Sequence, residues 1–104
     1  MSPNPMYRAG AHFETRVRRY LKGKGWVVIR SAGSRGAVDL VAARGGEIVL
    51  LQCRVGGEFS LPQRLGLYAV AHEFGGRGIL TWRSGREIMW HEVDAQGHLT
   101  ETGL

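Results

Sequence analysis

The sequence predicts a single α/β domain in which two helices flank a central mixed β-sheet, in the order αβββαββ. Three observations predict this fold. Apolar residues recur at helical spacing in two segments, short apolar runs of strand length follow each segment, and glycine-rich turns separate the runs. A chain of this size buries roughly 60 to 70% of its unfolded surface, so one domain is expected over residues 1–104.

The first helix is predicted from Ala9 to Lys24. Its apolar residues fall at i, i+4, i+7 and i+8, the spacing of one buried stripe, and Gly23 and Gly25 mark its end. The stripe comprises Phe13, Val17, Tyr20 and Leu21.

Three strands are predicted next. The run 26–29 is entirely apolar and is therefore expected to be covered on both faces. After a glycine- and serine-rich loop at 31–36, strands at 38–43 and 47–54 flank the turn Gly45-Gly46. These last two strands should pair as an antiparallel hairpin.

The second helix is predicted to begin after Ser60, which can cap it, with Gln63 placed to complete a capping box. It should end at Gly75-Gly76. Its expected buried stripe comprises Leu61, Leu65, Tyr68, Ala69 and His72.

A last hairpin is predicted from strands at 79–82 and 87–93. Residues after Asp94 contain few apolar side chains, and we expect them to form a loose tail.

Positive charge is concentrated in the first half of the chain. Up to Arg54 there are ten Lys or Arg residues against three Asp or Glu, a net charge of +7, whereas the remainder carries −2. Twelve of the fourteen basic residues are arginine, which favours bidentate contacts with phosphate. Nucleic acid is the expected partner, although a solvated helix face or a GC-rich gene would give the same composition.

Cys53 is the only cysteine, so the sequence allows no internal disulfide. The first residues lack the layout of a secretory signal, and no apolar run approaches the roughly 20 residues that span a bilayer. We expect a cytoplasmic protein, in the host's cytoplasm if the gene is viral, with no membrane contact.

The hairpin around Gly45-Gly46 brings two polar residues together. Antiparallel pairing places residues opposite each other when their numbers sum to about 91, so Asp39 should lie opposite Gln52. Because side chains alternate along a strand, Arg54 should share the face of Gln52 while Cys53 points away. Cys53 can still offer its backbone carbonyl to a metal ion. Carboxylate and amide oxygens suit a hard cation.

Asp39 followed after twelve residues by Gln52-Cys53-Arg54 resembles a variant of the PD-(D/E)xK nuclease motif. The segments 10–14, 28–36 and 38–42, together with Phe74-Gly75-Gly76, are similar to the archaeal-type Holliday junction resolvases, over roughly Tyr7 to Trp90. The resemblance implies a restriction-endonuclease-like fold. It also implies a structure-selective endonuclease that resolves four-way DNA junctions by hydrolysis, with paired nicks from a symmetric homodimer.

The resemblance implies a role for each matching residue. The catalytic set would be Glu14, Asp39, Gln52, Arg54 and Ser34, with Ser31 competing for the role of Ser34. The ligands of Mg²⁺, for which Mn²⁺ can substitute, would be Asp39, Gln52, Glu14 and Cys53. The residues binding the DNA backbone would be Arg8, Arg16, Arg18, Arg30 and Arg35.

Two positions depart from the family pattern. Gln52 replaces an acidic residue, so the metal site loses one negative charge. Arg54 replaces a lysine and cannot act as a general base, because a guanidinium effectively never deprotonates. Its expected role is electrostatic only.

Structural alternatives stand beside these roles. Glu14 could simply pair with Arg18 on the helix surface, Asp39 could bond loop amides at a strand edge, and Gln52 could be a satisfied polar group at the end of a buried strand. Two other functions also remain: a non-catalytic DNA-binding module with a degenerate site, and a related nuclease acting on linear or damaged DNA. For the dimer we expect contacts from the second helix and last hairpin, through Leu65, Tyr68, Phe74 and Trp90.

Overall fold

The computed structural model describes the backbone of residues 5–31 and 36–104, with side chains in the first helix from Ala9 onward. Two helices and six strands are present in this part of the chain. They are α1 (Pro5–Gly23), β1 (Val27–Arg30), β2 (Leu40–Arg44), β3 (Glu47–Arg54), α2 (Leu61–Glu73), β4 (Arg77–Ser84), β5 (Glu87–Val93) and β6 (Leu99–Glu101). Within these ranges neither helix is long and apolar enough to cross a membrane.

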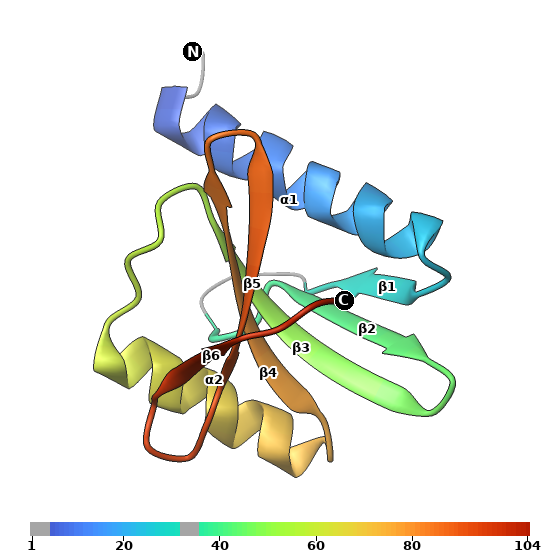
Figure 1. Cartoon of the computed structure of the whole chain (residues 1–104), viewed down its shortest axis with the longest axis vertical. Helices are drawn as coiled ribbons and strands as arrows, with labels where there is room; N and C mark the ends of the chain where they lie inside the picture. Colours follow the sequence, from blue (N-terminus) through green and yellow to red (C-terminus); the bar gives the residue numbers. More distant parts are fainter. Residues whose placement is uncertain (1–4, 32–35) are drawn as a thin grey trace.

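All six strands form one mixed sheet in sequence order, β1-β2-β3-β4-β5-β6 (Figure 1). Only the central pair, β3 and β4, is parallel, and it is joined by α2 as a crossover connection. The other neighbours are antiparallel. The predicted class, a mixed sheet with two helices, is confirmed.

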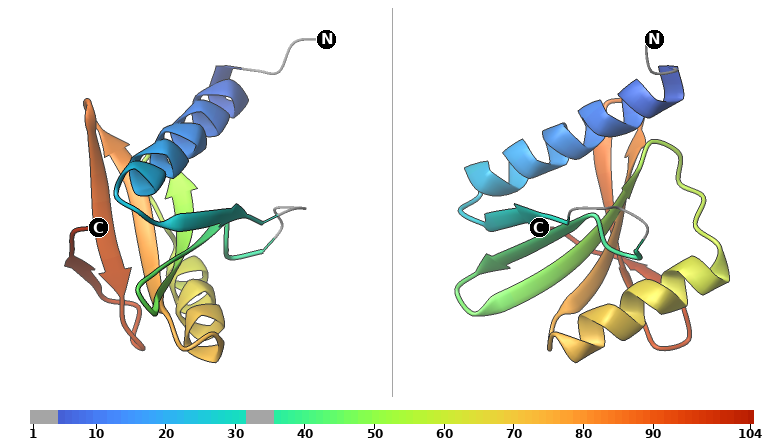
Figure 2. Two further views of the ribbon diagram at one scale, coloured as in Figure 1. Left: turned by 90° about the vertical axis from the view of Figure 1, so that its right-hand side faces the viewer. Right: turned by 180° about the vertical axis from the view of Figure 1, so that it is seen from behind.

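The helices lie on opposite faces of the sheet, as the two rotated views show (Figure 2). On the α1 face, Phe13, Val17 and Leu21 of the helix pack against the strands. On the α2 face, Leu67 and Ala71 cover Leu50 and Leu80 of the central strands. β3 and β4 are therefore buried on both sides, and the sheet is a layer between two apolar cores.

β1 differs from the prediction of a strand covered on both faces. It is an edge strand whose face opposite α1 is open: Val27 is 68% exposed and Ile29 is 63% exposed, while Val28 packs toward the α1 core. The apolar run was a misleading signal, because α2 covers the central strands and does not extend over this edge.

The start of α2 is as predicted, but its buried stripe is not. Ser60 Oγ accepts from the backbone N–H of Gln63, and Gln63 Oε1 accepts from the N–H of Ser60, completing the capping box. The helix, however, buries Leu67 and Ala71. The predicted stripe of Leu61, Leu65, Tyr68, Ala69 and His72 is wrong: it lies beside the core-facing side, half-buried or exposed. Apolar residues occur on several sides of this helix, so periodicity alone chose the wrong one.

The segment expected to be a loose tail contains a sixth strand. β6 pairs with β5, from Val93 opposite Leu99 to His91 opposite Glu101, so the element order is αβββαβββ. The turn before it is held by Asp94, whose Oδ1 accepts from the backbone N–H of Gln96 and of His98. The polar residues of this turn, which led us to expect a loose tail, stabilise the hairpin by hydrogen bonds to its backbone.

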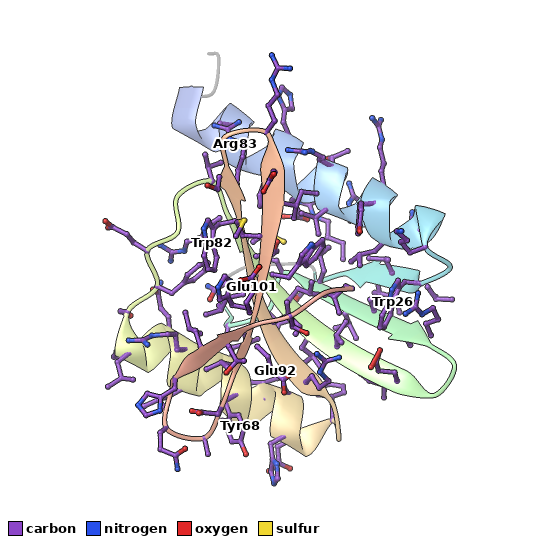
Figure 3. All side chains as sticks on the ribbon, viewed as in Figure 1. Trp26, Tyr68, Trp82, Arg83, Glu92 and Glu101 are labelled. Atoms are coloured by element: carbon purple, nitrogen blue, oxygen red, sulfur yellow. The ribbon has the colours of Figure 1, made fainter. Side chains whose placement is uncertain are left out.

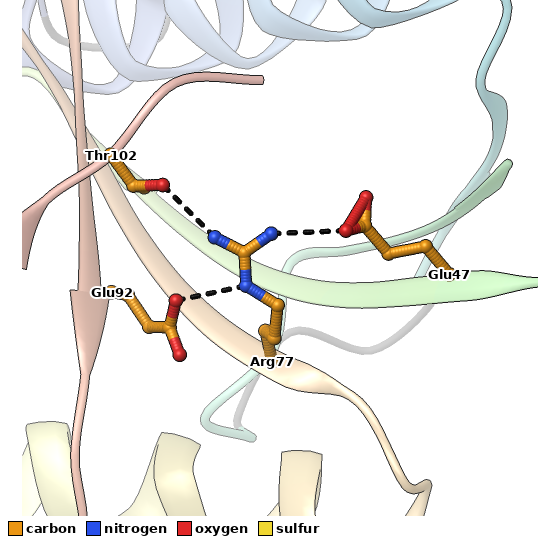
Figure 4. A network of polar contacts seen from close by, with 4 residues as sticks. All are labelled: Glu47, Arg77, Glu92 and Thr102. Carbon is orange, nitrogen blue, oxygen red and sulfur yellow. Dashed lines mark hydrogen bonds and ion pairs between the residues drawn. The ribbon is translucent and has the colours of Figure 1, made fainter.

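Arg77 connects the C-terminal segment to the sheet (Figure 4). Its guanidinium contacts Glu92 at 2.8 Å, Glu47 at 3.1 Å and the hydroxyl of Thr102 at 2.9 Å. Burial alone would lower the pKa of Arg77, but the hydrogen bonds and charges of Glu92 and Glu47 outweigh it and raise that pKa. One side chain thus links β3, β4, β5 and the residues after β6.

Candidate functional site

Asp39 lies directly before β2, where the pairing of β2 with β3 ends. Its backbone N–H donates to the carbonyl oxygen of Leu51 at 2.8 Å, and its Oδ2 accepts from the N–H of Cys53, also at 2.8 Å. Its own carbonyl oxygen accepts from the N–H of Ser31 at 2.9 Å. The carboxylate therefore replaces a backbone carbonyl as the partner of Cys53, and three hydrogen bonds, two to β3 and one to Ser31, hold Asp39 in place.

The predicted register of the hairpin is confirmed. Leu40 pairs with Leu51, and the numbers of all the paired residues sum to 91. The pairing ends there, and Asp39, the next residue, bonds Leu51 and Cys53 on either side of Gln52. The hydrogen bond from the Cys53 N–H also shows that Asp39 bonds a backbone amide at the edge of a strand, much as its structural alternative supposed. That hydrogen bond occupies Oδ2, so Oδ1 is the carboxylate oxygen that could bind a metal ion.

The side chains at the end of β3 alternate as predicted. Cys53 packs against the α1-side core, whereas Gln52 borders a hollow with residues of α2, and Arg54 lies over the ring of Phe59 in the α2-side core. Gln52 and Arg54 thus share a face and Cys53 points away. Because Glu14 comes from α1, it approaches β3 from the Cys53 side.

Glu14 forms an ion pair with Arg30 at the end of β1. The Nε of Arg30 is 2.9 Å from Oε1 of Glu14, whose side chain is 17% exposed while that of Arg30 is 62% exposed. The alternative pairing with Arg18 is not observed; Arg18 instead donates to the Thr15 hydroxyl at 3.4 Å. Two residues that were expected to act separately, one on metal and one on DNA, are therefore in contact.

Several hollows border the end of β3, and two of them are lined by Cys53 or Gln52. The larger, of about 540 Å³, is lined by Gly10 of α1, by Cys53 and Arg54, and by the loop 55–58. The other, of about 310 Å³, lies on the α2 face and is lined by Gln52, Gly36, Ala37, Pro62, Gln63 and Gly66. The side-chain oxygen of Gln52 is buried, and within residues 5–31 and 36–104 it has no hydrogen-bond partner.

The acidic surroundings of Cys53 act on its thiol. Burial, then the charges of Asp39 and Glu14, raise the pKa of Cys53 well above its ordinary value. The thiol is therefore protonated at neutral pH.

Among the residues that the structure describes, no three His, Cys, Asp or Glu side chains cluster in a way that could hold a metal ion. The expected ligand set relied also on Gln52 and on the Cys53 carbonyl. The structure brings Asp39 and Cys53 together, but it places Gln52 and Glu14 on opposite faces of β3.

The arginines expected to contact DNA fall into three groups. Arg16 and Arg30 are exposed, and Arg18 is half-buried with its Nε lacking a partner in the described part of the chain. Arg8 belongs to α1 by its backbone, but its side chain is not among those that the structure describes. Arg35 and Ser34 lie outside the described residues.

The sequence did not indicate that Arg83 and Arg86 lie beside the basic residues of α1. Arg83 of β4 lines a hollow with His12 and Arg16, beside the first half of α1 (Figure 3), and Arg16 donates to the carbonyl oxygen of Arg86. The charge count had assigned the basic surface to the first half of the chain. The Arg-Ser-Gly-Arg sequence of the β4–β5 turn was the available signal.

The aromatic residues also differ from expectation in part. Trp90, proposed as part of a dimer surface, is only 8% exposed and packs against Tyr20 with a centroid separation of 5.5 Å. It is therefore a core residue. Leu65 and Phe74, in contrast, are exposed at 36% and 56%.

Comparison with known proteins shows what the chain resembles. Residues 5–103 match the family model described as archaeal Holliday junction resolvase (Hjc). A segment of 48 residues, 46% of the chain, is 50% identical to the crossover junction endodeoxyribonuclease Hjc of Methanocaldococcus jannaschii, and this segment spans 35% of that relative's length.

The fold resembles that of a solved structure, the Archaeoglobus fulgidus Hjc, a Holliday junction resolvase from an archaeal hyperthermophile. The TM-score is 0.69 at 24% sequence identity, over 84% of this chain and 78% of the other. This likeness supports the restriction-endonuclease-like fold, and the family model covers nearly the whole chain. The chain belongs to the archaeal Holliday junction resolvase (Hjc) family.

Proposed function

We propose that the chain is a metal-dependent endonuclease that cuts four-way DNA junctions. The observation that carries the proposal is the carboxylate of Asp39, directly before β2, whose Oδ2 lies 2.8 Å from the backbone nitrogen of Cys53 in the Gln52-Cys53-Arg54 segment. Family membership supports the substrate, because the relative from Methanocaldococcus jannaschii is named as a crossover junction endodeoxyribonuclease.

The oxygen groups at this point fit Mg²⁺. Asp39 has a second carboxylate oxygen, and the buried Oε1 of Gln52 has no partner among the described residues. Mg²⁺ usually takes one or two carboxylates and fills the remaining positions with water and substrate phosphate. The Cys53 carbonyl and Glu14, which approaches β3 from the face opposite Gln52, are the other proposed ligands. Mg²⁺, or Mn²⁺ in its place, would supply the Lewis acid and the activated water for hydrolysis.

The other side chains hold and orient the phosphate. Arg54 neutralises negative charge that develops on the phosphate and moves no proton, because its guanidinium stays protonated. Ser34 is proposed to contact a phosphate oxygen. The exposed arginines, Arg16 and Arg30, bind the backbone of the junction arms and make binding dependent on salt.

A cleavage assay on a synthetic four-way junction tests this function. With Mg²⁺ or Mn²⁺ the wild type should produce nicks near the branch point, and Asp39→Asn should bind the junction but produce none. Excess linear duplex should leave the junction complex intact. Efficient cutting of the linear competitor would favour the alternative of a related nuclease that acts on linear or damaged DNA.

A non-catalytic DNA-binding module is the second candidate, and one observation favours it. The described residues hold no cluster of three metal-binding acidic, Cys or His side chains, and Gln52 and Arg54 replace the acid and the lysine of the family pattern. Tight junction binding without nicks in either metal, together with nicks by Gln52→Glu, would identify a degenerate site.

We further propose that the active form is a two-fold dimer, because resolution of a symmetric junction needs two nicks. The exposed Leu65 of α2 and Phe74 directly after it, with the half-buried Tyr68, offer an apolar contact surface. Sedimentation should show a dimer at micromolar concentration. A Phe74→Asp variant should be a folded monomer that still binds junctions weakly, and a purely monomeric wild type would contradict this part.

A further inference from the structure

Arg54 rests on an aromatic support that sequence reasoning did not find. Its Cζ lies 5.5 Å from the ring centroid of Phe59, and its Nη1 donates to the carbonyl oxygen of Glu58 at 3.4 Å. We propose that Phe59 is a positioning residue for Arg54. On this view the site is constructed to hold an arginine at position 54, and the arginine is not simply a lost lysine. The inference rests on the role proposed for Arg54 in the nuclease.

Phe59 is itself packed against other rings. Phe59 is 9% exposed, and its ring lies 5.8 Å from that of Trp82 at an angle of 53°. Trp82 in turn stacks on His91, with 4.4 Å between the centroids and 19° between the planes. The guanidinium of Arg54 therefore lies at one end of a chain of successive ring contacts, from Phe59 before α2 to Trp82 of β4 and His91 of β5.

The pairing of β3 with β4 and the loop 55–58 both bring Arg54 close to Trp82. Arg54 and Trp82 are directly paired in the parallel register of β3 and β4, so their side chains share the α2 face. Gly57 runs so close to the indole that an added Cβ would stand 2.9 Å from Nε1 of Trp82. The loop 55–58 can follow this path only with glycine at that point, and it carries the Glu58 carbonyl to Arg54.

The supported guanidinium borders the proposed reaction site. Arg54 lines the hollow of about 540 Å³ together with Cys53, whose amide holds Asp39. It also lines a second hollow of about 560 Å³ with Phe59, Ser60 and Arg64. Phe59 therefore determines how the guanidinium lies at the boundary between the two hollows.

The contact suits arginine and not lysine. A planar guanidinium can face a ring and bond a carbonyl at the same time, whereas an ammonium is a compact, strongly hydrated point charge. Returning the family's lysine should therefore impair this chain: Arg54→Lys is expected to cut junctions about 10-fold more slowly than the wild type, the effect of roughly one misplaced charged contact.

A double-mutant cycle in single-turnover junction cleavage tests whether Phe59 acts through Arg54. Phe59→Leu should slow cleavage about 5-fold or more in the wild-type background and cause no further loss in Arg54→Met. Phe59→Tyr keeps the ring and should keep the rate. Leu21→Ala, a buried change in the other core, controls for lost stability and should leave the rate intact below its melting temperature.

An NMR measurement separates this inference from the proposed function. The Nε–Hε resonance of Arg54 should carry a ring-current shift that disappears in Phe59→Leu and persists in Phe59→Tyr, whether or not the protein cuts DNA. An Arg54 resonance that Phe59→Leu leaves unchanged, equal losses in both backgrounds of the cycle, or an Arg54→Lys variant as active as wild type would each overturn the proposal. The ring-current shift without any wild-type cleavage would defeat only the proposed nuclease function.

Discussion

The Nε of Arg30 lies 2.9 Å from Oε1 of Glu14, so the acidic residue that the first helix offers to the candidate site is paired with the end of β1. The pairing joins an anionic candidate ligand to a candidate DNA-binding residue. A bound phosphate would draw Arg30 away, and a bound cation would compete with Arg30 for Glu14. Substrate and metal should therefore influence each other through this pair.

Removing Arg30 tests that coupling. At saturating junction, Arg30→Gln should lower the Mg²⁺ concentration needed for half-maximal cleavage, because Glu14 loses its competing cation. Stability should change by about 1 kcal/mol, since the Arg30 side of the pair is 62% exposed and screened by solvent while Glu14 is largely buried. Arg44→Gln removes the same charge from a guanidinium over Trp26 and should leave the Mg²⁺ dependence unchanged. An unchanged Mg²⁺ requirement in Arg30→Gln would show that the pair does not gate the metal.

The chain after α2 passes very close to β3 at Gly76, so alanine should destabilise the fold much more at Gly76 than at Gly23. An added Cβ at Gly76 would stand 2.8 Å from the backbone oxygen of Ile48, so Gly76→Ala should destabilise the fold by about 1 to 3 kcal/mol. Gly23, at the end of α1, has nothing within 4 Å of the same position. Urea unfolding of both alanine variants checks this. Equal midpoints would mean that the Gly76 turn can relax.

Arg77 predicts how the C-terminal strand is retained. Arg77→Met removes contacts to Glu92, Glu47 and Thr102 at once, and a loss of about 1 to 3 kcal/mol is expected, reduced by partial exposure. Amide exchange in β6 should accelerate more than in β3. Arg83→Met is the matched change at an exposed arginine and should alter neither quantity.

The thiol of Cys53 predicts a pH dependence with a definite sign. Its folded-state pKa is raised by burial and by Asp39 and Glu14, so it lies above that of an unfolded thiol. The contribution of the protonated thiol to the free energy of unfolding is therefore complete below the pKa of the unfolded thiol. It is lost as the pH rises from that pKa through the higher folded-state pKa. In EDTA-containing buffer, alkylation of native Cys53 by iodoacetamide should be slow at pH 8 and much faster in urea. Rapid native alkylation at pH 8 would contradict the raised pKa.

The sequence predicted the local structure best where one backbone interaction decides it. The Ser60–Gln63 capping box and the Gly45-Gly46 turn each leave few alternatives, and both are present as expected. The turn sets the register of the hairpin, and that register is enough to bring Asp39 to the Gln52-Cys53-Arg54 segment, where its carboxylate bonds the Cys53 N–H.

Prediction failed where the answer depends on which distant element covers a surface. Nothing within the apolar run at 26–29 indicates that α2 lies too far away to cover it, and α2 itself carries apolar residues on more than one side. The same limit applies to the site. The Arg30–Glu14 pair and the Phe59 support join residues whose contact is set by the sheet and loops, and no local pattern encodes either.

The most direct test of the central claim is single-turnover cleavage of a four-way junction in Mg²⁺ by the wild type and by Asp39→Asn, with junction binding and melting temperature measured in parallel. The proposed site predicts branch-point nicks by the wild type, and an Asp39→Asn variant that binds the junction and keeps its fold but whose cleavage falls at least about 100-fold. An Asp39→Asn protein that is equally stable and still cuts at the wild-type rate would contradict the assignment of Asp39 as the centre of the active site.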